Sequence, residues 1–281
     1  MGNRATSIAI IGGGKMGGAI LAGWIGSQEG AAASIGPEAI IVVNPGEARR
    51  NQLASEYQVT CVADVSELPL CNLVVLAVKP QVMFDMLASL HDSPAYAGPL
   101  SDTLFVSIAA GLGTDRLQAA LPEGARLVRV MPNTPLLVGQ GAAAVCASAS
   151  STDEDVAYVA DLFGCMGTAV VVDEADIDAV CALSGSGPAY VAWLVECMRD
   201  AAVRQGLEAA LAEKLALQTV LGTAQLIAET GVTPESCREA VCSPGGTTLA
   251  ALDAMQATGF AESVDAGVAA AVRRSKELAQ C

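Results

Sequence analysis

The sequence predicts an α/β fold in which a doubly wound parallel sheet over residues 1–173 is followed by an all-α domain over residues 174–281. Three features predict it. Short apolar segments separated by helical patterns fill the first part, a glycine-rich turn joins the first strand to the first helix, and the chain is almost entirely helical after Asp173. Strands that are apolar throughout are typical of a parallel sheet covered by helices on both faces.

The strands of this sheet are predicted from short apolar runs. The first run, residues 8–11, leads into the glycine turn, and apolar residues then recur at helical spacing from Met16 to Trp24. A polar loop is expected at residues 27–37. The remaining predicted strands are residues 39–44, 72–80, 103–111, 125–133, 141–148 and 167–173. Helices are predicted between them at residues 47–57, 82–90, 114–121 and 152–166.

The C-terminal part is predicted to consist of helices. The first has Pro188 in its first turn, where proline is favoured, and stops at Gly206. The others are predicted at residues 210–230, 235–241, 247–257 and 261–279. The long helix at 210–230 is apolar on more than one face, so it must be buried on several sides. Since about a hundred residues of helix make a thin core, we expect part of this surface to be buried in a partner subunit.

Charge and cysteine content disfavour several classes of protein. The formal net charge of -15, from 15 basic and 30 acidic residues, disfavours binding to nucleic acid or to an anionic membrane. Nine cysteines without a C-x-x-C pair, and a single histidine, argue against a zinc site and a disulfide framework. No apolar run is long enough to span a bilayer, and no secretory segment precedes the first strand. We therefore expect a cytoplasmic protein without a bound metal ion.

Gly12, Gly14 and Gly17 match the G-x-G-x-x-G pattern of dinucleotide-binding loops. In such loops the first glycine makes the tight turn, the second lets the pyrophosphate approach the backbone, and the third lets helix and strand pack closely. The strand before the pattern and the helix after it favour a Rossmann-like dinucleotide-binding domain over a purely structural glycine turn.

The end of the second strand bears on the choice of dinucleotide. An NAD site usually has an acidic residue there, whereas this chain has the neutral Asn44, followed by Arg49 and Arg50. An amide and guanidinium groups suit the 2′-phosphate of NADP. NADPH is therefore favoured. NADH stays open, because Glu47 could accept a ribose hydroxyl and the arginines could instead be solvated.

Further polar segments stand where the fold places ligands. Lys79 ends one predicted strand and Asn133 another, although ordinary turn chemistry explains both equally well. Residues 243–248, SPGGTT, precede a predicted helix, whose unpaired N–H groups and dipole attract an anion. The alternative is a glycine turn followed by Thr247 as the helix cap. His91 is expected in a polar loop, exposed to solvent.

Six motifs, in order along nearly the whole chain, resemble those of the pyrroline-5-carboxylate reductases. They are GGGKMG, LAVKPQ, SIAAG, RVMPNTP, LSGSGPAYV and SPGGTT. The resemblance implies an enzyme that reduces 1-pyrroline-5-carboxylate to L-proline by hydride transfer from NAD(P)H, the last step of proline biosynthesis. It also implies an all-α dimerisation domain that interleaves with that of a second subunit, in homodimers that often assemble further.

The same resemblance implies roles for individual residues. The cofactor-binding residues it implies are Gly12, Gly14, Lys15, Met16, Gly17, Asn44, Arg49, Asp64, Ala77, Val78, Lys79, Pro80, Ala109, Ala110 and Asn133. The substrate-binding residues it implies are Ser243, Gly245, Gly246, Thr247 and Thr248. The chain departs from the family at Asp64 and at Ala240, which are often asparagine, and at Thr247, which is often a smaller residue.

No histidine, cysteine or carboxylate stands out as an essential general acid. An imine accepts a hydride best when its nitrogen is already protonated, so a hydroxyl that orients the nitrogen is sufficient, and Thr248 is the candidate catalytic residue. The N–H groups of Gly245, Gly246 and Thr247 would bind the substrate carboxylate. Catalysis is then mainly the positioning of two reactants.

Two other functions are weighed against this one. A β-hydroxyacid-dehydrogenase-like oxidoreductase would share the glycine loop, but such enzymes use a lysine on a long interdomain helix, and the helix after Gly187 has only Arg199 and Arg204. A non-catalytic NADP-sensing protein would bind partners through its helices, and the intact SPGGTT motif argues against it.

Overall fold

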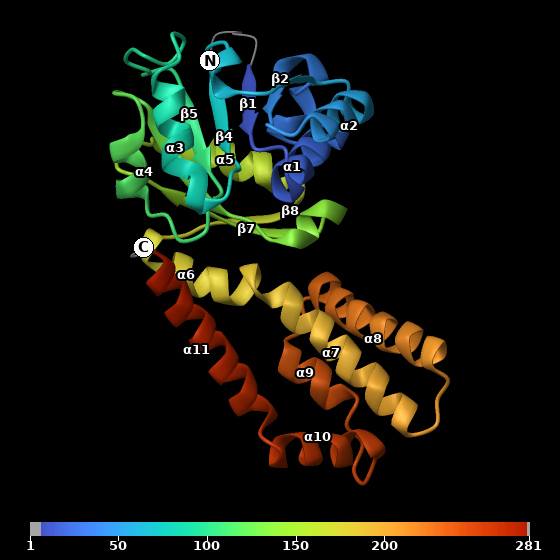
Figure 1. The fold of residues 1–281 in the computed structure, drawn as a ribbon. Helices are drawn as coiled ribbons and strands as arrows, with labels where there is room; N and C mark the ends of the chain where they lie inside the picture. The colour runs from blue at the N-terminus through green and yellow to red at the C-terminus, as the bar shows by residue number, and fades with distance from the viewer. Residues whose placement is uncertain (1–6, 280–281) are drawn as a thin grey trace. The chain divides into compact units, whose positions relative to one another are not determined.

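The computed structural model describes residues 7–279, and an eight-stranded sheet lies at the centre of its first part (Figure 1). In their order across the sheet, the strands are β3 (Thr60–Val62), β2 (Ile40–Val43), β1 (Ile8–Ile11), β4 (Leu73–Leu76), β5 (Leu104–Ser107), β6 (Arg126–Met131), β7 (Gly141–Ala147) and β8 (Gly167–Val171). The order from β3 to β6 is that of doubly wound dinucleotide-binding domains, and it confirms the predicted fold class.

One strand pair differs from the fully parallel sheet that was predicted. Strands β6 and β7 are antiparallel, whereas the other neighbouring pairs of the described sheet are parallel. Only residues 132–140 connect β6 to β7, and a parallel crossover needs a dozen or more residues. The short 3-10 helix η4 (Thr134–Val138) makes this reversal.

Strand β1 shows why its sequence is apolar throughout. Ile8 and Ile10 belong to one core cluster, and Ala9 and Ile11 belong to another. Buried side chains of α1 (Lys15–Gly26), α2 (Glu47–Tyr57) and α5 (Asp153–Gly164) complete the first cluster, and those of α3 (Pro80–His91) and α4 (Thr114–Ala120) complete the second. The sheet is therefore covered by helices on both faces, as Figure 1 shows.

Most predicted helices are confirmed to within a few residues. Helices α2 and α10 (Thr247–Ala257) have the predicted bounds. The other helices of the C-terminal part are α6 (Ile177–Val180), α7 (Gly187–Arg204), α8 (Ala209–Thr230), α9 (Pro234–Ala240) and α11 (Phe260–Ala279). His91, expected in a loop, is instead the exposed last residue of α3. Strand β3 was not predicted, because a strand of three residues has no readable periodicity.

The chain forms two compact units. Among the described residues, one unit contains the sheet and comprises residues 7–186 and 271–279, and the other is Gly187–Ala270. Helix α11 therefore begins in the second unit and ends in the first. The domain boundary after Asp173 stays a prediction, since this division reflects packing alone.

The helices of the second unit bury few of their own side chains. Ala212 and Ala216 of α8 are buried, whereas large apolar side chains of α7 and α8 are exposed. Trp193 is 68% exposed, Leu217 57% and Leu221 50%. Apolar surface of this extent is typical of a protein interface.

Within residues 7–279, no helix is long and apolar enough to cross a membrane.

Candidate functional site

The order of the strands reverses between β1 and β4, and doubly wound folds bind ligands in the crevice beyond the strand ends at this point. The glycine turn follows β1, and Ala77 follows β4. The N–H of Gly12 donates to the carbonyl oxygen of Val43 at 2.9 Å, and the N–H of Ala77 donates to that of Ile11 at 2.8 Å. These bonds tie both loops to the neighbouring strands at the predicted cofactor site.

Steric constraints require glycine at two positions of this turn. Gly12 has a φ of 111°, and an added Cβ would lie 2.6 Å from the carbonyl oxygen of Ala77. A Cβ added at Gly17 would lie 2.0 Å from the carbonyl oxygen of Gly12. Around Gly14, by contrast, no atom lies within 4 Å of an added Cβ. The turn is tightly packed at Gly12 and Gly17 and open at Gly14.

The first turn of α1 has the features of an anion site. The helix begins at Lys15, and its N-cap residue Gly14 offers no side-chain hydrogen bond. The first N–H groups of a helix lack intrahelical acceptors, and the helix dipole adds positive character there. No acidic residue stands in this turn, and Lys15 is exposed beside it. The residues present therefore fit the pyrophosphate of a dinucleotide.

Arg49 of α2 binds the glycine turn directly. Its Nε donates to the carbonyl oxygen of Gly13 at 2.7 Å, and its Nη2 donates to that of Gly14 at 3.3 Å. Its Nη1 donates to the side chain of Gln52 at 2.8 Å. The residue predicted to contact a 2′-phosphate thus lies against the loop predicted to hold the pyrophosphate.

Arg50 is held at the end of β2. Its Nη1 donates to the carbonyl oxygens of Asn44, at 2.9 Å, and Pro45, at 2.7 Å. The side-chain amide of Asn44 donates to the carbonyl oxygen of Gly46 at 3.3 Å. Arg50 therefore stabilises the turn that presents Asn44, next to Arg49.

Asp64 has a structural task in the described chain. Its carboxylate accepts the N–H of Ser66 at 2.9 Å and forms a capping box with Glu67 at the 3-10 helix η3 (Val65–Glu67). The backbone N–H of Ser66 holds the pKa of Asp64 below its usual value. Capping accounts for an acidic residue here, and a contact with the cofactor stays a prediction.

Six further predicted cofactor contacts follow β4 and β5, which are neighbours in the sheet. Lys79 is exposed at the N-cap of α3, with Pro80 as the first helical residue. Ala77 and Val78 are half-buried. In the loop after β5, Ala109 is buried and Ala110 is exposed. The fold thus brings these two predicted groups to the same edge of the sheet.

Asn133 is engaged within the protein. Its Oδ1 accepts the N–H of Ala142 at 2.9 Å, and its Nδ2 donates to the carbonyl oxygen of Ser184 at 3.1 Å. It therefore joins the start of β7 to the π-helical segment η6 (Cys181–Gly185), at Ser184 of the LSGSGPAYV motif. These bonds explain an asparagine at this corner, and a contact with the cofactor stays a prediction.

A cluster of polar side chains around Glu174 was not predicted from the sequence. The carboxylate accepts the N–H of Thr114 at 2.7 Å, the hydroxyl of Thr114, and Nη1 of Arg129 at 3.0 Å. Burial works to raise the pKa of Glu174, but these hydrogen bonds outweigh it and lower that pKa. Burial, followed by the charge of Glu174, raises the pKa of Cys146, the strand neighbour of Arg129, to about 11. No sequence signal joins these residues, because they come from separate elements.

The SPGGTT segment forms a tight turn before α10. The N–H of Gly246 donates to the carbonyl oxygen of Ser243 at 2.9 Å, and Gly245 has a φ of 71°. Proline followed by a positive-φ glycine is the pattern of a type II turn. The N-cap of α10 is Gly246 and makes no side-chain bond, so the alternative with Thr247 as the cap is wrong. The turn extends to Gly246, and Thr247 is already helical.

The N–H groups that this turn leaves for an anion differ from the predicted set of Gly245, Gly246 and Thr247. That of Gly246 is committed to Ser243, whereas Thr247 and Thr248 occupy the first two positions of the helix, where N–H groups lack intrahelical acceptors. Thr248 is half-buried and Thr247 is exposed.

Within residues 7–279, no cluster of three or more His, Cys, Asp or Glu could hold a metal ion.

The matches to known proteins extend over nearly the whole chain. Residues 174–278 match the family described as pyrroline-5-carboxylate reductase dimerisation, and residues 7–111 match that described as NADP oxidoreductase, coenzyme F420-dependent. Pyrroline-5-carboxylate reductase of Synechocystis is 43% identical over 272 residues, which are 96% of this chain and 97% of the relative.

Solved structures agree with this match. A pyrroline-5-carboxylate reductase from Coxiella burnetii has a TM-score of 0.86 at 33% identity, covering 98% of this chain and 99% of its own. The Plasmodium falciparum pyrroline carboxylate reductase with NADP bound has a TM-score of 0.83 at 29% identity, covering 98% of each chain. These matches do not favour a β-hydroxyacid dehydrogenase or a sensor. With its glycine turn, its SPGGTT turn and full-length similarity, the chain belongs to the pyrroline-5-carboxylate reductase family.

Proposed function

We propose that this chain reduces 1-pyrroline-5-carboxylate to L-proline with NADPH, with NADH as the alternative cofactor, as the last step of proline biosynthesis in the cytoplasm. The observation that carries the proposal is family membership along nearly the whole chain. NADPH supplies a hydride from C4 of its nicotinamide, which reduces the imine carbon of the substrate.

The cofactor is proposed to lie along the edge of the sheet at β1, β4 and β5. The N–H groups at the start of α1 bind its pyrophosphate, and Asn44 with Arg49 binds its 2′-phosphate. The other proposed contacts are Gly12, Gly14, Lys15, Met16, Gly17, Asp64, Ala77, Val78, Lys79, Pro80, Ala109, Ala110 and Asn133. The open Gly14 and the uncapped helix support this assignment.

The substrate carboxylate is proposed to bind at the start of α10. The N–H groups of Gly245, Thr247 and Thr248 face it, helped by the helix dipole, while Gly246 and Ser243 shape the turn. The hydroxyl of Thr248 orients the protonated imine nitrogen. With no acid or base required, the chain accelerates the reaction by holding the reactants together and excluding water.

A second copy of the chain is proposed to cover the apolar helical faces. The match to a dimerisation family over residues 174–278 and the exposure of Trp193, Leu217 and Leu221 support a homodimer through the helical domain. Dimers of this kind could assemble further. Light scattering gives the mass of the assembly directly.

The decisive test is a steady-state assay with purified protein. Loss of NADPH absorbance on adding 1-pyrroline-5-carboxylate, with L-proline as the product, is the expected result. Tight NADPH binding without turnover would favour the sensor, and oxidation of a β-hydroxy acid by NADP would favour the dehydrogenase.

A further inference from the structure

We infer that Glu174 is a positioning residue, which holds the loop between β5 and α4 (residues 108–113) in the conformation that binds the nicotinamide half of the cofactor. The inference rests on the proposed function, because Ala109 and Ala110 of this loop are proposed cofactor contacts. Three sets of contacts restrain the loop, at its end, at its start and in its middle.

Glu174 holds the end of the loop. Helix α4 begins at Thr114, whose N–H donates to Oε1 of Glu174 at 2.7 Å and whose hydroxyl bonds to Oε2. Nη1 of Arg129 donates to the same Oε1 at 3.0 Å. Because Arg129 belongs to the inner strand β6 and its side chain is only 7% exposed, Glu174 joins the end of the loop to a buried side chain of the sheet.

The start of the loop is held by the strand next to β6. Ser107, the last residue of β5, pairs with Arg129 in the sheet register. The hydroxyl of Ser107 accepts the N–H of Ala109 at 3.3 Å, and the N–H of Ile108 donates to the carbonyl oxygen of Leu76 at 3.2 Å. The start of the loop is therefore held by β4 and β5, and its end is held by Glu174.

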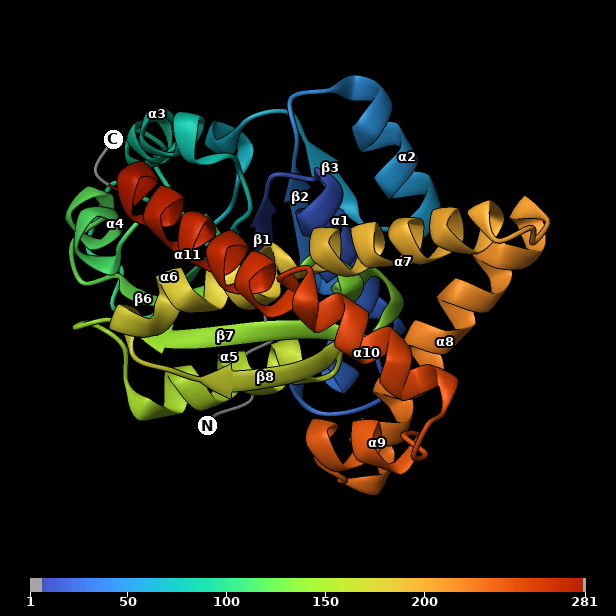
Figure 2. The ribbon, with the colours of Figure 1, turned by 90° about the horizontal axis from the view of Figure 1, so that it is seen from below.

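The last turns of α11 lie against the middle of the loop and against α4. Gly111 has a φ of 75°, and a Cβ added to it would lie 3.3 Å from Cβ of Leu278. Nη1 of Arg116 donates to the carbonyl oxygen of Ala279 at 3.1 Å, and its guanidinium lies 5.2 Å from the ring of Phe84. Figure 2 shows this end of α11 beside α3 and α4. Leu278 leaves the loop little room on that side.

A single substitution of Glu174 removes its hydrogen bonds to Thr114 and Arg129 together. Without this carboxylate, the N–H of Thr114 loses its acceptor and the buried Arg129 loses its counterion. The end of the loop is then no longer fixed to β6. Ala109 and Ala110 shift, and NADPH is held less well at its nicotinamide end, while the adenosine end, at β2, is untouched.

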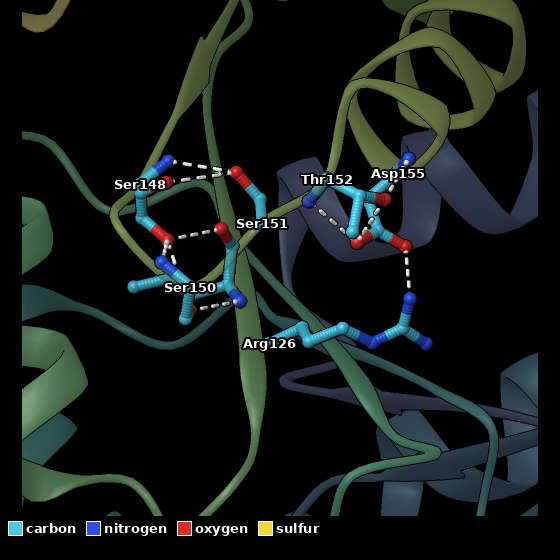
Figure 3. Close-up of polar contacts among 7 residues, drawn as sticks. Arg126, Ser148, Ser150, Ser151, Thr152 and Asp155 are labelled. Carbon is cyan, nitrogen blue, oxygen red and sulfur yellow. Dashed lines mark hydrogen bonds and ion pairs between the residues drawn. The ribbon is translucent and has the colours of Figure 1, made fainter.

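Asp155 offers a matched control, drawn in Figure 3. Its carboxylate accepts the N–H and the hydroxyl of Thr152, each at 2.9 Å, and Nη1 of Arg126 at 2.5 Å. The chemistry repeats that of Glu174, with a threonine at a helix start and an arginine of β6. Arg126 pairs with Leu104, the first residue of β5, whereas Arg129 pairs with Ser107, the last. The Asp155 cluster and the Glu174 cluster therefore lie at opposite ends of β5.

The experiment compares Glu174→Gln, Glu174→Ala and Asp155→Asn in the full-length protein. Measured are the KM for NADPH, the kcat, the thermal midpoint, and the Kd of adenosine 2′,5′-bisphosphate, which probes the adenosine end alone. Misplacing a contact by about an ångström costs up to roughly a hundredfold. We expect Glu174→Ala to raise the KM for NADPH about tenfold or more, Glu174→Gln to raise it less, and neither to change the Kd of the bisphosphate.

Asp155→Asn is expected to lower the thermal midpoint without changing the KM for NADPH. An unchanged KM in a folded Glu174→Ala protein would overturn the inference, as would an equal rise in Asp155→Asn or a parallel loss of bisphosphate affinity. If Glu174→Ala does not fold, Glu174→Gln decides by the same criteria. Turnover by the wild-type protein tests the proposed function separately. If the wild-type protein shows no turnover, the Kd of NADPH is compared among the variants in place of KM.

Discussion

Arg49 donates a hydrogen bond from Nε to the carbonyl oxygen of Gly13 at 2.7 Å, across 36 residues of sequence. A side chain from α2 therefore helps to fix the turn that precedes α1. The same guanidinium stands at the end of β2, where a 2′-phosphate would bind. If Arg49 also binds the proposed 2′-phosphate, its two effects are separable, since support of the turn affects every dinucleotide and attraction of a phosphate affects NADPH alone.

Arg49→Ala combined with Arg50→Ala is expected to raise the KM for NADPH far more than that for NADH. Each lost charge-assisted hydrogen bond costs about 1.5–3 kcal/mol, or roughly tenfold to a hundredfold in affinity. Steady-state kinetics with both cofactors measure the ratio. Arg274→Ala, which removes an exposed arginine paired with Glu277, serves as the control. Equal effects on NADPH and NADH would remove the 2′-phosphate assignment.

Gly17→Ala is expected to weaken the binding of both cofactors. The new Cβ would lie 2.0 Å from the carbonyl oxygen of Gly12, so the turn must shift, at a cost of about 1–3 kcal/mol. Gly26→Ala, at the other end of α1, meets no atom within 4 Å and is expected to leave binding unchanged. Fluorescence titration with NADPH compares the two proteins, and equal affinities would contradict the tight packing at Gly17.

Thr248→Ala is expected to lower kcat/KM with little change in the fold. The loss corresponds to one hydrogen bond in the transition state, roughly 1–3 kcal/mol. Thr258→Ala is the control, because that hydroxyl bonds to the carbonyl oxygens of Ala254 and Met255 at the far end of α10. Kinetics with varied 1-pyrroline-5-carboxylate give the values. If Thr248→Ala keeps wild-type kinetics, Thr248 has no part in the mechanism.

Glu174 is expected to make stability depend on acidity. Its folded-state pKa lies below the ordinary value of about 4.3, so its contribution is complete above that value and is lost as pH falls through the folded-state pKa. Urea unfolding of wild type and Glu174→Gln should therefore differ most near neutral pH, and the difference should shrink below about pH 4.3. A difference that is independent of pH would show that the charge of Glu174 contributes nothing.

Leu221→Lys is expected to dissociate the assembly. Leu221 is 50% exposed on α8, and a second copy that covers it would bury the new charge without a partner. Light scattering measures the mass, with Leu221→Met as the control that keeps an apolar side chain of similar volume. An unchanged mass for Leu221→Lys would place the interface elsewhere.

Local patterns predicted much of the fold. The strand, glycine turn and helix near the N-terminus are confirmed. They were predictable because their signals, the apolar periodicity and the glycines at positions 12 and 17, lie within one short segment of sequence. The antiparallel β7 was not predicted, since its direction depends on the short connection through residues 132–140. Strand β3 was missed because three residues carry no pattern.

The predicted site residues show the same division. Motifs located the two turns that carry Gly12 and Gly245, since a turn is set by its own residues. They did not indicate that the side chain of Asn133 donates to the carbonyl oxygen of Ser184, or that the N–H of Gly246 donates to that of Ser243. These hydrogen bonds depend on which neighbour the folded chain brings within hydrogen-bond distance.

By itself, the sequence determined the class of fold, the positions of most helices and strands, and the family, because these depend on periodicity, glycine and proline placement and short motifs. Only the tertiary structure decided which side chains meet. Glu174, Thr114 and Arg129 are far apart along the chain, yet one carboxylate binds the other two. A sequence pattern reports what a segment prefers, whereas such a contact exists only after strands and helices have packed.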